Sequence, residues 1–271
     1  MDRLRRAYHE FFFAAEPIAR VRLFRRGLAL WTAVYVGQQL PHLEELYCRP
    51  ILREGRLDAW FGISPPPYAL IVGLMAALLI ALALVIVDAA TRRAQLVVVA
   101  LFLGLSLLEA SPPRAYGELA MVQWPLVALA PVGPPDRLAP RWGTRLVMLQ
   151  LSAVYVYAAL AKLVEGPAWR DGEAIVLISR SAFYGQHLLS AGVTVERGPL
   201  ALALAWSTIA LELGIGVLLW PARTRVAAAC GLVTLHLGIA ATMRISLLFH
   251  ALMLLHLVLF VGPPWAWGRR G

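Results

Sequence analysis

Long apolar runs separated by short arginine-rich segments dominate the chain between residues 27 and 262. Eight of these runs come close to the roughly 20 residues that a helix needs to cross about 30 Å of hydrocarbon. The third and fourth runs are the weakest, because one is short and Pro125 and Pro131 interrupt the other, so the two can form one tilted or re-entrant hairpin. The pattern predicts an all-α, polytopic membrane helix bundle of about eight transmembrane helices. The predicted bounds are Gly27–Leu43, Tyr68–Asp88, Gln95–Leu108, Gly117–Val132, Gly143–Leu163, Pro199–Leu219, Val226–Ala241 and Ser246–Gly262.

The composition leads to the same class. Hydrophobic residues make up 60% of the 271 positions and charged residues 15%, and the mean hydropathy is +0.68. One soluble core cannot bury that much apolar surface. Ahead of the first run, Ala7 to Arg26 combines three phenylalanines with several arginines, which is typical of an amphipathic segment on a membrane surface. We therefore expect a lead-in over residues 1–26 at the inner surface, a transmembrane helical domain over 27–262 and a cytoplasmic tail over 263–271.

The arginines predict the orientation, because cytoplasmic loops contain the excess of positive charge. With the N-terminus inside, 16 arginines fall on the cytoplasmic side and 8 on the other, which places both termini in the cytoplasm. The net charge of +9 then matches anionic membrane lipids, and no basic loop interleaved with aromatic residues indicates a nucleic-acid partner. No cleavable signal peptide is expected, because the first apolar run begins late and lacks a small-residue cleavage site. The excess of arginine over lysine and the abundance of alanine are typical of a GC-rich bacterial genome, so we expect this multi-pass protein in a bacterial inner membrane.

Signatures of common soluble enzymes are missing from the sequence, which has no phosphate-binding loop with a Gly-Lys step, no GxSxG, no HExxH and no paired CxxC. None of the six histidines has a second histidine four residues away, so a zinc site is not expected. The two cysteines, Cys48 and Cys230, are expected at different depths and therefore as free thiols. We expect Cys230 to be a small buried apolar residue.

Lys162 is the only lysine of the chain and stands near the end of an apolar run. An arginine cannot be deprotonated in a protein, whereas a lysine that loses its water can become a neutral amine and act as a base. Tyr155 precedes Lys162 by seven residues and so shares nearly the same helix face. Glu212, His236 and His250 are further polar residues at membrane depth, where such groups are costly and tend to face the bundle interior.

A rise of about 1.5 Å per residue puts Lys162 within a turn of the outer face, His250 about 6 Å deep, His236 about 9 Å and Glu212 about 18 Å. We therefore expect Lys162, His236 and His250 to meet, and Glu212 to lie too deep unless its helix tilts or breaks. Simpler interpretations remain open for each residue. The lysine can extend to the interface, the two histidines can be hydrogen-bonded core residues, and Glu212 can link two helices. His256 is assigned to packing.

Three stretches resemble a known family. The first reads YAALAKLVEGPAWRDGEA from Tyr157, and the second reads ELGIGVLLWPARTR from Glu212 and continues to LHLGIAATM, which contains His236. A third, LFRRG, begins at Leu23. Together they resemble the horizontally transferred transmembrane (HTTM) family, whose best-known member is the vitamin K-dependent gamma-carboxylase.

The resemblance implies roles for individual residues. It makes Lys162 the base that begins oxygenation of a vitamin K hydroquinone, and it implies a quinol or vitamin K-like lipid as cofactor. His236 matches the histidine of the penultimate-helix motif, and Glu212 matches an acidic position that opens a helix–turn–helix. The predicted site therefore has Lys162 and His236 as catalytic residues and Tyr155, Trp169, Glu212 and His250 as substrate-binding residues, without a metal.

Two departures from the carboxylase limit what the resemblance implies. The region Ser111–Glu118 lacks the asparagine and histidine that precede the lysine helix in the carboxylase. No large lumenal domain is expected after Gly262, so short loops or a partner subunit would have to recognise any peptide substrate. Bacterial relatives include a maturation component for a secreted toxin, which implies that the membrane core also occurs without that domain.

Two functions remain open at this point. In the first, the chain is a membrane enzyme in which Lys162 takes a proton from a quinol-like lipophilic substrate or takes part in modifying a secreted peptide. The outer loop Val164–Arg197, with Trp169, Phe183 and Tyr184, would then form the rim of the site. In the second, the chain is a non-catalytic membrane scaffold or maturation partner of a secreted peptide. A transporter ranks third, because matching Gly or Pro breaks are not found in two halves of the sequence.

Overall fold

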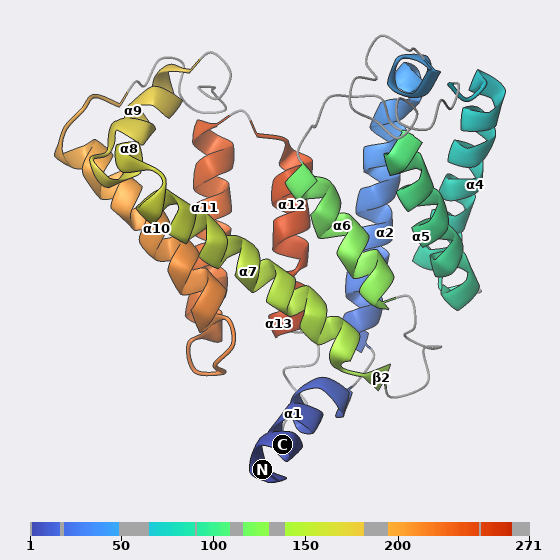
Figure 1. Cartoon of the computed structure of the whole chain (residues 1–271), viewed down its shortest axis with the longest axis horizontal. Helices are drawn as coiled ribbons and strands as arrows, with labels where there is room; N and C mark the ends of the chain where they lie inside the picture. The colour runs from blue at the N-terminus through green and yellow to red at the C-terminus, as the bar shows by residue number, and fades with distance from the viewer. Residues whose placement is uncertain are drawn as a thin grey trace. The chain divides into compact units, whose positions relative to one another are not determined.

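The computed structural model of the chain describes residues 2–16, 19–48, 65–89, 91–108, 116–129, 139–181, 195–243 and 245–261. Helices account for most of these residues, and the two strands contain two residues each. The all-α prediction is therefore confirmed (Figure 1). The chain divides into two compact units, Met1–Val147 and Met148–Gly271, and the helix α7 begins in the first and continues through the second.

The first unit is built around three adjacent helices, with α2 packed against α4 and α4 against α5. Its core contains Phe24 and Leu28 of α2 and Leu78 and Leu82 of α4, all with almost no exposed surface. The strands β1 and β2 pair in antiparallel fashion next to the start of α7. The elements are α1 (Asp2–Phe13), β1 (Ala15–Glu16), α2 (Ala19–Gln39), the 3-10 turn η1 (Leu40–His42), the π-helical turn η2 (Glu44–Cys48), α4 (Tyr68–Ile86), α5 (Thr91–Leu108), α6 (Tyr116–Leu129) and β2 (Ala139–Pro140).

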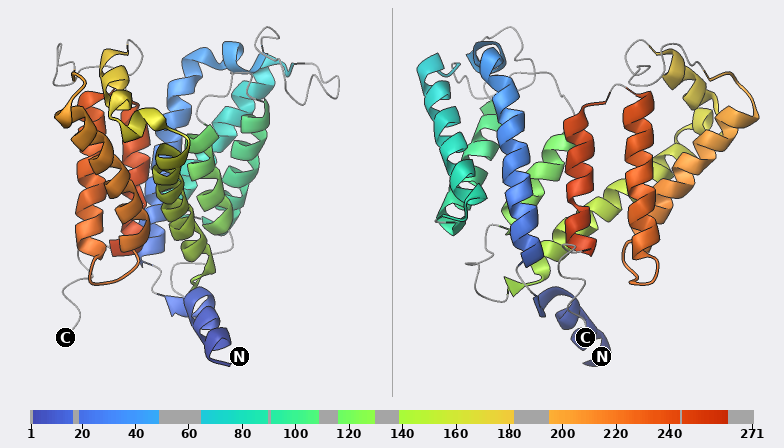
Figure 2. Two further views of the ribbon diagram at one scale, coloured as in Figure 1. Left: turned by 60° about the vertical axis from the view of Figure 1, so that its left-hand side comes forward. Right: turned by 180° about the vertical axis from the view of Figure 1, so that it is seen from behind.

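The second unit contains two oblique helices and two that stand side by side. Its elements are α7 (Trp142–Val164), α8 (Pro167–Arg170), α9 (Glu173–Arg180), α10 (Pro199–Leu218), α11 (Arg225–Thr242), α12 (Leu247–Leu255) and α13 (Leu257–Val261). The helices α7 and α10 run obliquely to α11 and α12, which Figure 2 shows from two further sides.

Three of the described helices, α4, α7 and α10, are long and apolar enough to cross a membrane. In each, only 33% of the apolar window is buried among the described residues, so about two thirds of its positions remain partly or largely exposed. Helix α4 is apolar on every face and exposes Leu70 and Ile80. Such surface is stable in lipid and not in water, so the chain is a membrane protein. The count of eight spans and the cytoplasmic position of both termini stay predictions.

Several boundaries differ from the sequence-based expectations. Helix α2 begins at Ala19, eight residues before the predicted run, so the predicted lead-in contains α1 and the first two turns of α2. The last predicted run is interrupted at His256, between α12 and α13. His256 is buried and its Nδ1 lies 2.7 Å from the carbonyl oxygen of Leu252, in agreement with a packing role. Cys48 and Cys230 are free thiols, but the expected burial of Cys230 is wrong, because it lies on an exposed face of α11.

Candidate functional site

One face of α7 presents three polar side chains to three different partners. Ser152 and Tyr155 are buried, Lys162 is half-buried, and the intervening Ala159 is buried. Tyr155 follows Ser152 by three residues, and Ala159 and Lys162 follow Tyr155 by four and seven residues. Residues with these spacings lie along one stripe of a helix. Ser152 Oγ accepts a hydrogen bond from Trp220 Nε1 at 2.8 Å. The stripe therefore marks α7 as the helix that organises the polar interior of the second unit.

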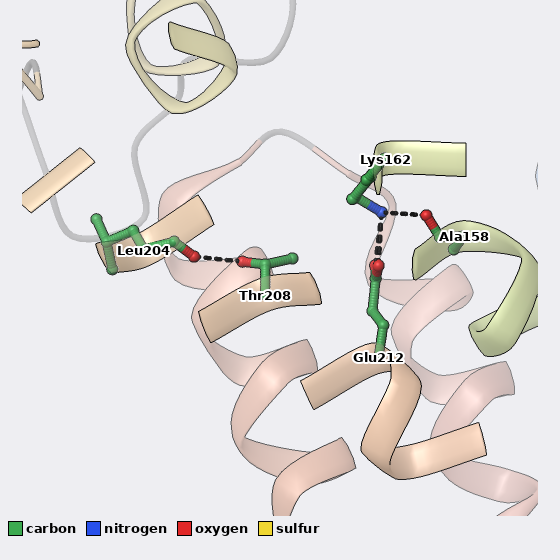
Figure 3. Close-up of polar contacts among 5 residues, drawn as sticks. All are labelled: Ala158, Lys162, Leu204, Thr208 and Glu212. Atoms are coloured by element: carbon green, nitrogen blue, oxygen red, sulfur yellow. Dashed lines mark hydrogen bonds and ion pairs between the residues drawn. The ribbon is translucent and has the colours of Figure 1, made fainter. Parts of the chain in front are cut away.

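Lys162 forms an ion pair with Glu212 of α10. Lys162 Nζ lies 2.8 Å from Glu212 Oε1 and 2.7 Å from Oε2, and 3.5 Å from the carbonyl oxygen of Ala158. The Lys162 side chain is 18% exposed and that of Glu212 10%. Figure 3 shows the amine pointing from α7 toward the carboxylate. The only lysine of the chain is therefore paired with a buried carboxylate inside the unit.

Lys162 and Glu212 meet because α10 runs obliquely, which is the tilted case that the sequence left open, and begins well beyond the end of α7. The chain that leaves α7 through α8 packs beside the first turns of α10: Trp206 Nε1 donates to the carbonyl oxygen of Arg170 at 3.2 Å. Lys162, near the end of α7, is therefore already level with the fourth turn of α10, where Glu212 lies. A depth estimated from the number of residues between each side chain and its helix end is valid only if the ends of α7 and α10 are level, and they are not.

The motif Trp169-x-x-Gly172 determines how α8 and α9 lie against α10. Gly172 has a φ of +82°, which L side chains rarely adopt, and a Cβ there would lie 2.7 Å from the backbone nitrogen of Leu202. Glycine at this position thus permits both the turn and the close contact with α10. Trp169 then lies over the amine, with Lys162 Nζ 5.0 Å from its ring centroid, a distance at which a cation is attracted to the ring face.

The second polar cluster links α7, α11 and α12. Tyr155 Oη lies 2.5 Å from His236 Nε2, and His236 Nδ1 lies 2.8 Å from His250 Nδ1. All three residues are buried, with exposed fractions of 3–4%. The imidazoles of His236 and His250 meet edge to face at a centroid distance of 5.1 Å. The expected meeting of the two histidines is confirmed, whereas their partner on α7 is Tyr155 and the partner of Lys162 is Glu212.

The hydrogen bonds of this cluster have a consistent direction. A neutral imidazole carries one N–H, so each ring can accept at one nitrogen and donate from the other. When Tyr155 donates to His236 Nε2, His236 donates from Nδ1 to His250 Nδ1, and the proton of His250 is on Nε2. That Nε2 atom is buried and has no hydrogen-bond partner among the described residues. The three side chains can thus relay a proton, and His250 Nε2 is the end that remains available.

Gly216 is a point of close approach between α7 and α10. A Cβ on Gly216 would lie 2.6 Å from Val156 Cγ2 and 3.0 Å from the carbonyl oxygen of Ser152. Gly216 follows Glu212 by one helical turn, and Val156 precedes Lys162 by six residues. The absence of a side chain at Gly216 therefore lets the two helices approach closely enough for the ion pair to form.

We expect Gly216→Ala to lower the free energy of unfolding by about 2 kcal/mol, because the methyl group overpacks the contact with α7. Gly214→Ala is a matched control, since its Cβ would meet only Leu218 Cδ1, at 3.8 Å. The measurement is the unfolding midpoint of each variant in detergent. Equal midpoints for Gly216→Ala and the wild type would contradict the assignment of Gly216 as the contact point.

The structure adds positions that the sequence did not single out as site residues. The Ala158 carbonyl, Ser152 and Trp220 each hydrogen-bond within this region, and their only sequence signal was helical spacing from Lys162 and Glu212. The predicted rim residues Phe183 and Tyr184 lie outside the described residues. Among the residues that the structure describes, no three His, Cys, Asp or Glu side chains converge in a way that would hold a metal ion.

Comparison with known proteins identifies the family. The model of the HTTM domain matches residues 128–265, slightly more than half of the chain. Neither the comparison with curated proteins nor the comparison with solved structures finds a match. The matched range includes every helix from α7 to α13, and with them the Lys162–Glu212 pair and the Tyr155–His236–His250 chain. The chain therefore belongs to the HTTM domain family, as the resemblance of its lysine and histidine motifs predicted.

Proposed function

We propose that this HTTM-domain protein is a membrane enzyme in which Lys162 is a base and Glu212 its proton partner, acting on a quinol-like lipophilic substrate. The observation that carries the proposal is the ion pair between the only lysine and a buried carboxylate, on two helices that are each long and apolar enough to cross a membrane. Arginine supplies every other cationic side chain apart from the histidines, so an amine at this one place is consistent with a need for deprotonation. A secreted peptide modified in the same step is the proposed second substrate.

The geometry supports a simple proton path. The Lys162 ammonium has three N–H bonds, and the Glu212 oxygens and the Ala158 carbonyl lie within reach of them. Transfer of one proton to Glu212 removes both charges, which a medium of low dielectric constant favours, and leaves a lone pair on Nζ. The neutral amine can then take the proton of a substrate hydroxyl, which yields a substrate oxyanion and restores the ammonium beside Trp169.

Access from the lipid is consistent with a lipophilic substrate. The lipid-facing side of α7 is apolar, with Tyr157 69% and Val164 73% exposed on the face opposite Lys162. The Lys162 side chain itself is 18% exposed. The amine is therefore not fully enclosed by protein, and in this proposal a molecule dissolved in the membrane reaches it from the side of α7.

We propose that the Tyr155–His236–His250 chain transfers protons at a second position along the same face of α7. Seven residues separate Tyr155 from Lys162, which is about 10 Å along the helix axis. The chain joins three helices by side-chain hydrogen bonds alone, and each imidazole can accept a proton on one side while releasing one on the other. In this proposal His236 is the central relay residue and His250 its end.

The alternative is a non-catalytic scaffold or maturation partner of a secreted peptide. The same ion pair favours it, because Lys162 and Glu212 join α7 to α10 whether or not a proton ever moves between them. The two functions differ in what they require of residue 162. A scaffold needs a cation that pairs with Glu212, whereas an enzyme needs a cation that can lose its proton.

We expect Lys162→Arg to retain the fold and lose the reaction. Arginine keeps the positive charge and can pair with Glu212, but it cannot become a neutral base, so the rate should fall by about 100-fold or more. The measurement is mass spectrometry of lipids extracted from purified protein in nanodiscs, which reports any retained quinone-type lipid and its modified form. Arg5→Lys on α1 is a control in which the opposite exchange occurs at an exposed position.

The result distinguishes the two functions. The enzyme predicts a redox lipid and a modified product with the wild type and Arg5→Lys, and the lipid without the product in Lys162→Arg. The same product in Lys162→Arg would exclude Lys162 as the base. Bulk lipid alone in all three proteins would instead favour the scaffold.

A further inference from the structure

A cluster of three arginines and one aspartate stands at the end of α4, in the first unit. Asp88 Oδ2 lies 2.7 Å from Arg26 Nη2 and 3.4 Å from Arg22 Nε, and Asp88 Oδ1 lies 3.5 Å from Arg25 Nη2. All three arginines are on α2, which packs directly against α4. The four side chains, three cations and one anion, together carry a charge of +2.

Burial makes this excess charge unusual. The Arg25 side chain is only 1% exposed, and its Nε and Nη1 atoms are buried with no hydrogen-bond partner among the described residues. Arg22 and Arg26 are 34% and 43% exposed, so part of each guanidinium faces outward. The buried charge of Arg25, which among the described residues is paired only through Nη2 and at 3.5 Å, favours an additional anion nearby.

The position of Asp88 argues against a simple helix-capping role. Its backbone closes α4 in the Schellman pattern, with Asp88 N bonded to Val85 O at 3.2 Å and Ala89 N to Leu84 O at 2.9 Å. Asp88 has a φ of 59°, where glycine or asparagine is preferred, and a carboxylate is unfavourable next to the negative end of a helix. The arginines therefore stabilise an aspartate that local structure alone would disfavour, which indicates that the charged cluster itself is needed.

The cluster lies at the expected level of lipid headgroups. Helix α4 is one of the candidate membrane-crossing helices, and Asp88 follows its last residue by two positions. Two further exposed arginines, Arg92 and Arg93, begin α5 four and five residues after Asp88. Five arginines on α2 and α5 thus gather about one end of a hydrophobic helix, at the depth where membrane lipids present their phosphate groups.

We propose that Arg22, Arg25 and Arg26 form a binding site for the phosphate group of an anionic membrane lipid. The planar guanidinium groups of Arg22 and Arg26 match phosphate oxygens in a bidentate arrangement, and both are partly open to the surroundings. Arg25 contributes its buried charge and holds Asp88, which orients the two outer arginines. The ligand chemistry is a phosphate with at least one negative charge, and its source is the headgroup of a lipid or free phosphate.

The test compares two lipids and one soluble anion on the delipidated full-length protein. Phosphatidylglycerol, phosphatidylcholine and inorganic phosphate are each titrated, and bound lipid is counted by native mass spectrometry while the unfolding midpoint is followed. We expect phosphatidylglycerol to bind at least tenfold more tightly than phosphatidylcholine. The double variant Arg22→Gln/Arg26→Gln should lose that preference, and it retains the buried Arg25–Asp88 pair, so it should fold.

Arg223→Gln is the matched control, because it removes an exposed arginine between α10 and α11. It should bind phosphatidylglycerol like the wild type. Displacement of the lipid by millimolar inorganic phosphate is expected, because both present the phosphate group that the arginines recognise. Inorganic phosphate that binds more tightly than phosphatidylglycerol would make free phosphate the ligand and would overturn the assignment to a lipid. Equal binding of the two lipids by the wild type, or an undiminished preference in the double variant, would overturn the proposal.

Discussion

Replacing Glu212 with leucine is expected to lower the free energy of unfolding by about 3–5 kcal/mol, the usual effect of removing one partner from a buried ion pair. The change leaves the Lys162 ammonium, which is only 18% exposed, without its counter-charge. Glu212→Gln should have a smaller effect, because the amide oxygen can still accept a hydrogen bond from Lys162. The measurement is reversible unfolding in mixed micelles, with the midpoint and slope recorded for each variant.

The double variant Lys162→Met/Glu212→Leu provides the decisive comparison. Replacing both partners by apolar residues of similar volume is often neutral or even stabilising, since no buried charge remains. We therefore expect the double variant to recover most of the stability that Glu212→Leu loses. Additive losses from Lys162→Met and Glu212→Leu would show instead that the two residues do not act as a pair.

The same variant separates chemistry from architecture. A scaffold needs α7 and α10 to stay together, which an apolar pair can achieve, so the scaffold function predicts that the double variant retains its activity in the cell. The enzyme function predicts a stable protein that forms no product. For an enzyme, the double variant thus keeps its stability and loses its function. Neither single variant can separate the two, because each is expected to lose stability as well.

The bounds of the long helices were predictable, because in a membrane protein the length of an apolar run closely matches the length of the helix that it forms. The bounds of α4, α7 and α10 agree with the predicted runs to within two residues at each end. Lys162 was found because it is unique, and Gly172 because it belongs to a recognisable motif. Each of these signals is local, so none of them needs knowledge of how the helices are arranged.

The partners of Lys162 and His236 were not predictable in the same way. Pairing depends on the relative heights of helices, and the contact of α8 with the first turns of α10 changes those heights. The cluster around Asp88 was missed for a related reason. Arginines next to a membrane span are ordinarily assigned to the surface, and nothing in the spacing of Arg25 indicated that it would be buried against α4.

Asp88→Asn is expected to lower the free energy of unfolding by about 3 kcal/mol in a zwitterionic lipid such as phosphatidylcholine. Asparagine tolerates the positive φ of this position, so the backbone is not strained and the effect comes from the lost charge. The buried Arg25 then has no carboxylate, and three like charges face one another. Asp171→Asn is the control, because its pair with Arg197 is largely exposed and should contribute less than about 1 kcal/mol.

The anionic lipid should reverse much of that loss. Asp88 competes with a bound phosphate for the same guanidinium groups, so its removal raises the charge of the cluster from +2 to +3 and should tighten phosphate binding. Ligand binding to the folded state stabilises it in proportion to the logarithm of ligand concentration over Kd. We therefore expect phosphatidylglycerol to raise the midpoint of Asp88→Asn more than that of the wild type. If it raises both equally, Asp88 is a structural counter-ion alone and does not compete with the phosphate for the arginines. If it raises neither midpoint, the arginines do not bind lipid phosphate.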